Sequence, residues 1–161
     1  MLEKLLEGGF NEEKSLEIIN SVIKIKTNEN SFSTVDAFIF NLRTANAEFV
    51  KLGSAPTYII EDGKVITINS SSLPVGVIKD TDYLPIAKQL KEGTVVVQIS
   101  DGVVEEEIDV NDNYFKTHLQ NIDISKTSKA ISEELRKFVI KEKKGLLDDD
   151  FTIMVSKVIK S

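Results

Sequence analysis

The sequence predicts an α+β domain in which helices pack on antiparallel β-sheet. Apolar residues recur at helical spacing near the N-terminus and again after Gly102. Between these regions, from about residue 33 to about residue 100, apolar runs of strand length alternate with short turns. A last apolar run, residues 151–158, also has the length of a strand. The predicted order is therefore helix, helix, strands, helix, helix, strand, and the short turns predict antiparallel pairing.

The N-terminal region predicts two helices. Leucines in residues 2–6 lie at helical spacing, and Gly8-Gly9 ends this first segment as a C-cap does. Asn11 is a good N-cap for a second helix. The second helix has one apolar stripe that needs a sheet as its partner, formed by Leu16, Ile19, Val22 and Ile23.

The middle of the chain predicts the strands. Residues 35–40 are apolar on both faces, which favours a strand buried on both sides, and Asp36 within it is expected to have a structural hydrogen-bond partner. Asp62-Gly63 between two apolar runs is a strong hairpin signal. The other predicted strands are residues 47–52, 57–60, 65–68, 82–90 and 94–99.

The C-terminal part predicts a short helix over residues 111–119 and a longer one that Ser125 caps and Gly145 ends. The single histidine, His118, is expected on the surface of the short helix. Because there is no internal repeat, low-complexity tract or linker, we expect residues 1–161 to form a single domain.

Composition excludes several classes of protein. The net charge of −6 argues against a nucleic-acid binder, which needs a basic face for phosphates. The chain has no cysteine, so disulfides and thiolate metal sites are impossible. No apolar run approaches the roughly 20 residues that cross a bilayer. We therefore expect a cytoplasmic chain, with any membrane anchor confined to another part of a longer parent protein.

Two acidic segments lie at strand ends. Asp101-Gly102 follows the apolar run 95–99, and the acidic run 148–150 precedes the last strand. If these strands lie side by side, Asp101 and Asp149 can converge on one cation. Ligands that are all oxygen favour Mg²⁺ or Mn²⁺ over zinc. Alone, an Asp-Gly pair is more often a turn and an acidic run more often a solvated loop, and a structural domain stabilised by Ca²⁺ or Mg²⁺ is also possible.

These segments and others resemble a known enzyme class. The matching stretches occur in family order with family spacing: residues 33–36, 47–56, 70–76, 100–103 and 149–152. Together they resemble the PPM (protein phosphatase 2C-like) metal-dependent serine/threonine phosphatases, and within that class the stage II sporulation protein E family.

The resemblance implies a β-sandwich of two antiparallel sheets with helices on both outer faces. It implies that Asp101 and Asp149 are metal ligands, that Gly102 and Asp150 support the site, and that Asp148 is the weakest ligand candidate. Such a domain uses two Mn²⁺ or Mg²⁺ ions to activate water against a phosphoserine or phosphothreonine. The implied substrate is a phosphorylated regulatory protein of the anti-anti-sigma-factor type, in the control of sporulation and sigma factors.

The sequence departs from the family in one respect. The family has an earlier Asp-Gly metal motif, whereas here Asp36 precedes Ala37 and Asp62-Gly63 lies in a predicted hairpin. Residues 1–10 resemble the end of the helix that follows that motif. We therefore expect a domain truncated at its N-terminus, with a partial metal site and weak or no activity; the alternative is a non-catalytic binding module or pseudophosphatase. The exposed sheet edge of such a fragment predicts a homodimer.

Overall fold

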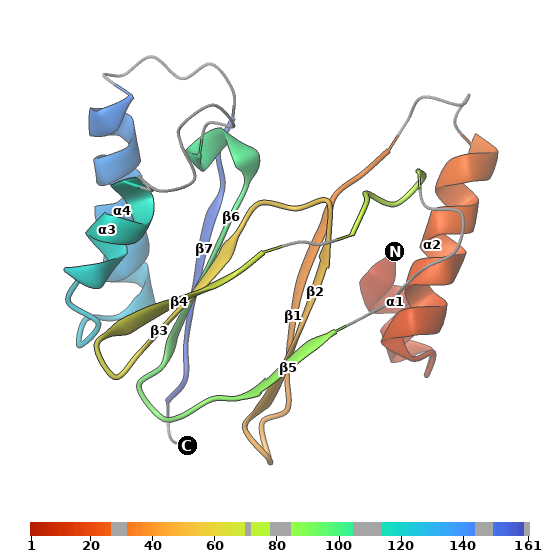
Figure 1. Cartoon of the computed structure of the whole chain (residues 1–161). Helices are drawn as coiled ribbons and strands as arrows, with labels where there is room; N and C mark the ends of the chain where they lie inside the picture. The colour runs from red at the N-terminus through yellow and green to blue at the C-terminus, as the bar shows by residue number, and fades with distance from the viewer. Residues whose placement is uncertain (27–31, 70–71, 78–84, 105–113, 144–149, 160–161) are drawn as a thin grey trace. The chain divides into compact units, whose positions relative to one another are not determined.

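The computed structural model divides the chain into two compact units. The first contains residues 1–41, 46–54 and 70–88, and the second contains residues 42–45, 55–69 and 89–161. The structure describes residues 1–26, 32–69, 72–77, 85–104, 114–143 and 150–159. Each unit has its own sheet and helices (Figure 1).

Two helices begin the first unit, as the sequence predicted. Helix α1 covers Leu2–Glu7 and helix α2 covers Glu12–Lys26. The Asn11 side chain caps α2, because its Oδ1 accepts a hydrogen bond from the Lys14 amide at 2.9 Å. This contact confirms the predicted N-cap.

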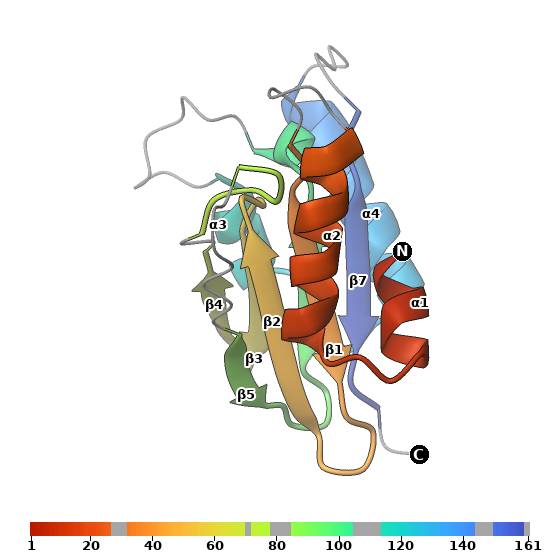
Figure 2. The same cartoon turned by 90° about the vertical axis from the view of Figure 1, so that its right-hand side faces the viewer.

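The helices of the first unit pack on an antiparallel pair of strands. Strand β1 (Val35–Phe40) pairs with β2 (Asn46–Leu52), and β5 (Ile86–Gln89) lies on the other side of β2. Figure 2 shows α2 running along these strands. The predicted apolar stripe does find a sheet: Leu16 and Ile19 pack against Val50, Leu52, Val75, Val35, Ala37 and Ile39. Strand β1 is only partly buried along its whole length, so the prediction of a strand buried on both faces was wrong.

The carboxylate within β1 has a cross-strand partner. Asp36 lies directly opposite Lys51 of β2, and the Lys51 Nζ is 2.9 Å from the Asp36 Oδ2. The Lys51 side chain is only 2% exposed and that of Asp36 is 15% exposed. Burial lowers the pKa of Lys51, and the hydrogen bond and charge of Asp36 oppose that shift. Asp36 thus has the structural role that the sequence predicted.

The second unit is built on a four-stranded sheet. Its strands are β3 (Thr57–Glu61), β4 (Lys64–Ile68), β6 (Val95–Ile99) and β7 (Ile153–Lys157), in the order β4-β3-β6-β7. Every pair is antiparallel. Asp62 and Gly63 join β3 to β4 with φ of 51° and 71°, the conformation of a type I′ hairpin turn. The hairpin prediction is therefore confirmed.

Helices α3 (Tyr114–Gln120) and α4 (Ser128–Glu142) cover one face of this sheet (Figure 1). Thr127, not Ser125, caps α4: its side chain accepts a hydrogen bond from the Ala130 amide at 3.2 Å. The Ser125 amide instead donates to the Asp123 Oδ1 in the preceding loop, at 2.9 Å. The core between helices and sheet is formed by Tyr58, Ile60, Val95, Val97, Ile99, Val103, Phe115, Leu119, Ile122, Ile131, Leu135 and Val139.

Several predicted boundaries differ from the structure. The strand expected over residues 82–90 is the shorter β5, and residues 82–84 lie outside the described part of the chain. The predicted helix ends at residue 111 and at Gly145 also lie outside it. Within the described residues, no helix combines the length and the apolar character that crossing a bilayer requires.

Candidate functional site

The two acidic segments lie at the ends of neighbouring strands. Strands β6 and β7 pair antiparallel, with Ile99 opposite Ile153 and Val95 opposite Lys157. The end of β6 is therefore beside the start of β7. This is the arrangement on which the predicted convergence of Asp101 with the acidic run depended.

Hydrogen bonds continue this pairing beyond the strands. The Ser100 amide donates to the Thr152 carbonyl oxygen at 3.1 Å, and the Thr152 amide donates to the Ser100 Oγ at 2.8 Å. Ser100 thus uses both its backbone and its side chain to hold the segment that enters β7. The two loops are joined through these two residues before either reaches its aspartates.

Gly102 brings the loops into direct contact. A Cβ atom at this position would lie 2.4 Å from the Asp150 carbonyl oxygen and 3.1 Å from the Asp150 carbonyl carbon. Only glycine leaves room for the backbone of the second loop. The supporting role expected for Gly102 therefore has a steric basis, and Asp101 and Asp150 belong to adjacent backbones.

Asp101 begins a short 3₁₀ turn, η1 (Asp101–Val103). Its side chain is exposed, and its Oδ1 accepts a hydrogen bond from the Gly102 amide at 3.0 Å. Asp150 is exposed as well. Asp148 and Asp149 lie outside the described residues, so the role of Asp149 as a ligand stays a prediction.

The donors in these loops fit a hard divalent cation. Carboxylate oxygens are the ligands that Mg²⁺ and Mn²⁺ prefer, and Asp101 presents one on an exposed turn. In the part of the chain that the structure describes, no group of three or more His, Cys, Asp or Glu side chains is arranged to hold a metal ion. The described residues thus contribute single carboxylates rather than a complete coordination sphere.

The other Asp-Gly pair of the sequence has a structural role. Asp62 forms an ion pair with Lys91, and the hydrogen bond and charge of Lys91 lower the pKa of the Asp62 carboxyl. Together with the hairpin geometry, this contact confirms that Asp62-Gly63 is a turn.

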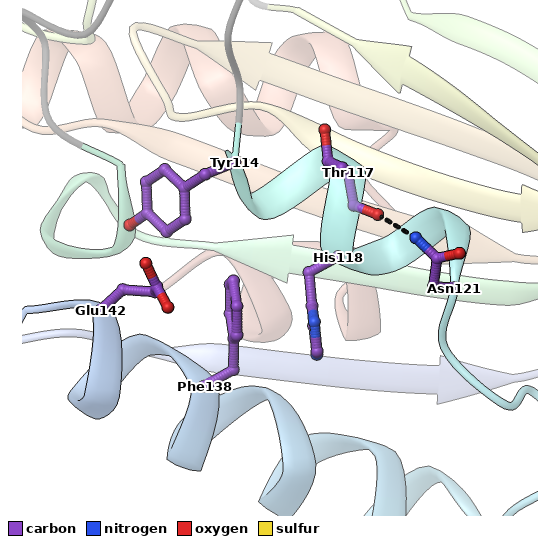
Figure 3. Close-up of a pocket in the computed structure, with 6 residues that line it drawn as sticks. All are labelled: Tyr114, Thr117, His118, Asn121, Phe138 and Glu142. Carbon is purple, nitrogen blue, oxygen red and sulfur yellow. Dashed lines mark hydrogen bonds between the residues drawn. The ribbon is translucent and has the colours of Figure 1, made fainter.

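A pocket of about 380 Å³ opens between α3 and α4 (Figure 3). The His118 ring stacks on the Phe138 ring at a centroid distance of 3.8 Å, and the Tyr114 ring lies 5.8 Å from Phe138. The Asn121 Nδ2 donates to the Thr117 carbonyl oxygen at 2.9 Å, and Glu142 completes the lining. His118 is partly buried, and its Nε2 has no hydrogen-bond partner among the described residues, so the expectation of a plain surface residue is corrected.

Two residues near the candidate site were missed from the sequence. The sequence motif of residues 100–103 contains Ser100 but predicts no contact for its side chain, and no sequence pattern predicts a role for Tyr114. The Tyr114 hydroxyl donates to the Val103 carbonyl oxygen, at the end of η1, at 2.7 Å. No local pattern signals either contact, because each joins segments that are separate in the sequence.

Comparison with known proteins supports one family. A family model described as Stage II sporulation protein E (SpoIIE) matches residues 1–159. Stage II sporulation protein E of Priestia megaterium is 34% identical over 163 residues, and that of Bacillus subtilis (strain 168) is 31% identical over 160 residues. Each alignment covers 98% of this chain, but only 27% and 19% of the relatives. Phosphoserine phosphatase RsbU of Bacillus subtilis is 23% identical, over 96% of this chain and 47% of its own length.

Solved structures show the same fold. A structure of the PP2C phosphatase domain with a fragment of the regulatory domain of SpoIIE from Bacillus subtilis superposes with a TM-score of 0.87 at 31% identity. The alignment covers 99% of this chain and 49% of the SpoIIE chain in that structure. The Mn-presoaked SpoIIE phosphatase domain, also from Bacillus subtilis, gives a TM-score of 0.72 at 28% identity, over 99% of this chain and 72% of that one.

These matches confirm the α+β fold class, with antiparallel sheets flanked by helices, and the resemblance noted in the sequence. The chain spans about a quarter or less of the curated SpoIIE proteins that it matches. It belongs to the stage II sporulation protein E family, whose members are PP2C-type phosphatases.

Proposed function

We propose that this chain supplies Asp101 and Asp149 to the metal centre of a phosphoprotein phosphatase. The close approach of Gly102 to the Asp150 backbone supports this proposal most directly, because it brings the two aspartate-bearing loops together. The exposed Asp101 carboxylate and the all-oxygen donor set support Mn²⁺ or Mg²⁺ as the ion. Gly102 and Asp150 hold the loops in register.

Asp101 and Asp149 would hold the ions, whose chemistry would be the activation of water and the neutralisation of phosphoryl oxygens, so that the protein needs no nucleophile of its own. The residues of this chain have a simpler task. Asp101 offers its carboxylate from a turn whose backbone is held by hydrogen bonds, and Ser100 fastens that turn to the entry of β7. The turn that carries Asp101 is thus held by hydrogen bonds within the protein, which lowers the cost of ordering that carboxylate when an ion binds.

We further propose that this chain has low turnover when it acts alone. Two cations held close together repel each other unless carboxylates bridge them, and two aspartates provide few such bridges. The remaining Asp-Gly pair, Asp62-Gly63, is occupied in a hairpin and paired with Lys91. The structural role of Asp62-Gly63 also favours a second candidate function, a non-catalytic module that still binds the phosphoprotein.

The names of the relatives support one substrate class. RsbU is a phosphoserine phosphatase, and the SpoIIE proteins are named for sporulation. We propose phosphoserine or phosphothreonine on a small regulatory protein of the anti-anti-sigma-factor type, with residues 1–161 acting in the cytoplasm as part of one phosphatase domain of a longer parent.

The proposal is tested by metal binding and phosphate release in parallel. Mn²⁺ affinity is measured by the loss of the free-ion EPR signal, and phosphate release is measured from a phosphoserine protein with and without Mn²⁺. Asp101→Asn removes a charge at the proposed site. Asp123→Asn is the matched control, because Asp123 lies beside the loop that Lys157 contacts, at the opposite end of β7.

We expect Asp101→Asn to weaken Mn²⁺ binding by at least tenfold and Asp123→Asn to leave it unchanged. Equal Mn²⁺ binding by both variants would overturn the site assignment. Metal-dependent turnover by this chain that equals that of an intact phosphatase domain would overturn the proposal of low activity, even if the site assignment holds.

A further inference from the structure

We propose that Tyr114 is a positioning residue for the Asp101 turn. Its hydroxyl donates to the Val103 carbonyl oxygen at 2.7 Å, and Val103 is the last residue of the 3₁₀ turn that Asp101 begins. A side chain from α3 therefore holds the far end of the turn that presents Asp101. The link to metal binding rests on the proposed function, whereas the hydrogen bond to the turn does not.

The turn itself has few internal restraints. The Val103 amide donates to the Ser100 carbonyl oxygen at 3.1 Å, and the Val104 amide donates to the Asp101 carbonyl oxygen at 3.0 Å. A single 3₁₀ turn has strained hydrogen-bond geometry and little cooperativity. A hydrogen bond from outside the turn therefore contributes a large share of its rigidity.

The buried carbonyl oxygen of Val103 needs the Tyr114 hydroxyl as its hydrogen-bond donor. Val103 is fully buried, and a buried carbonyl oxygen that lacks a donor is costly. The Tyr114 hydroxyl satisfies it at the short distance typical of an O–H···O bond. Phenylalanine at position 114 would keep the ring and remove the hydroxyl that donates to Val103.

Tyr114 is well placed to transmit the rigidity of the helices. Its ring lies 5.8 Å from Phe138 of α4, and Phe138 in turn stacks on His118 of α3 (Figure 3). Both helices pack on the sheet through buried residues such as Phe115 and Leu135. The phenol is thus oriented by the helical layer, independently of the acidic loops.

The first test is hydrogen exchange of the Val103 and Val104 amides, measured by NMR in the full chain without metal. We expect Tyr114→Phe to accelerate their exchange by about threefold to tenfold, the effect of losing one neutral hydrogen bond. Ile131→Val is the control, because Ile131 belongs to the same core but lies on α4. The exchange rates of the Val103 and Val104 amides in Ile131→Val show how much a general loss of stability accelerates them.

Exchange at Val103 and Val104 that rises no more in Tyr114→Phe than in Ile131→Val would refute the positioning role. The second test is Mn²⁺ affinity, with the same EPR measurement. We expect Tyr114→Phe to weaken binding severalfold and Ile131→Val to leave it unchanged. Faster exchange with unchanged Mn²⁺ affinity would refute the coupling between Tyr114 and the metal.

The two proposals fail in different ways. If Asp101→Asn does not change Mn²⁺ binding, the site assignment is wrong, and so is the coupling of Tyr114 to it. The exchange measurement still decides whether Tyr114 holds the turn. If Asp101→Asn abolishes binding and Tyr114→Phe does not affect it, the site stands and the positioning of the metal ligand by Tyr114 is refuted.

Discussion

Replacing Gly102 with alanine tests whether the contact between the two loops matters. The added Cβ would lie 2.4 Å from the Asp150 carbonyl oxygen, about 0.6 Å inside the 3.0 Å below which such contacts are essentially never seen. The obstacle is backbone, so no side-chain rotation relieves it. Gly102 does not have a positive φ, so the backbone conformation itself accepts alanine. The cost therefore comes from moving the 150–151 segment away.

Overpacking of this kind lowers stability by about 1–3 kcal/mol. For a chain of this size, each kcal/mol corresponds to a fall in Tm of about 2–4 °C. Because the displaced segment precedes β7 and adjoins the acidic run, we also expect Mn²⁺ affinity to fall at least tenfold. Stability is measured by urea denaturation, and affinity by the EPR signal of free Mn²⁺.

Gly93→Ala is a matched control. Gly93 has a φ of 86°, but no atom lies within 4 Å of its Cβ position. Alanine there costs about 1–2 kcal/mol through its conformation alone. The Gly93 amide donates to the Val158 carbonyl oxygen, at the end of β7 away from Asp101. We expect a similar loss of stability without any loss of Mn²⁺ binding. If Gly102→Ala binds Mn²⁺ as well as Gly93→Ala, the loop contact does not build the site.

Three further predictions concern stability. Thr127→Ala removes the α4 cap and should lower the free energy of unfolding by about 1 kcal/mol, whereas Thr127→Ser should keep the capping hydrogen bond. Equal urea midpoints for the two variants would contradict this prediction. Asp36→Asn removes the carboxylate that pairs with the buried Lys51 ammonium and should lower the free energy of unfolding by about 3 kcal/mol. A second change, Lys51→Met, should restore most of this loss, and additive effects of the two changes would disprove the pairing. Hydrogen bonds from Ser125 lower the pKa of Asp123 in the folded protein, so the ionised carboxylate stabilises the fold above its unfolded-state pKa of about 3.9. This stabilisation is lost as the pH falls through the folded-state pKa, so the urea midpoint of Asp123→Asn should fall less between pH 5 and pH 2 than that of the unchanged protein. Parallel pH profiles for the two proteins would argue against this prediction.

Much of the local structure could be predicted because its causes lie within a few residues. Asn11 caps α2 through an amide three positions away, and Asp62 and Gly63 form the hairpin turn with the positive φ angles that an Asp-Gly pair favours. The period of the apolar residues located the strands and helices to within a few positions. The pairing of β6 with β7 entered the sequence analysis only as a condition for Asp101 and Asp149 to converge, and the structure shows that the two strands do pair.

Other features depended on contacts that no local pattern specifies. The sequence predicted Ser125 as the cap of α4, but the structure places Thr127 there, two residues later, and the Ser125 amide donates to Asp123 in the preceding loop. The predicted strands do not form one sheet in sequence order: β5 returns to pair beside β2, whereas β3 lies between β4 and β6. Strand order depends on which surfaces bury each other, and a period of two residues carries no information about that.

The sequence by itself determined the family, the fold class and the identity of Asp101 as a candidate ligand, because residue types and their order carry these properties. Only the tertiary structure showed that the Gly102 backbone touches that of Asp150, that Ser100 binds Thr152 and that Tyr114 binds the Val103 carbonyl. Each of these contacts is shorter than 3 Å or sterically exclusive, and each joins segments that come together only when the sheet and its helices pack.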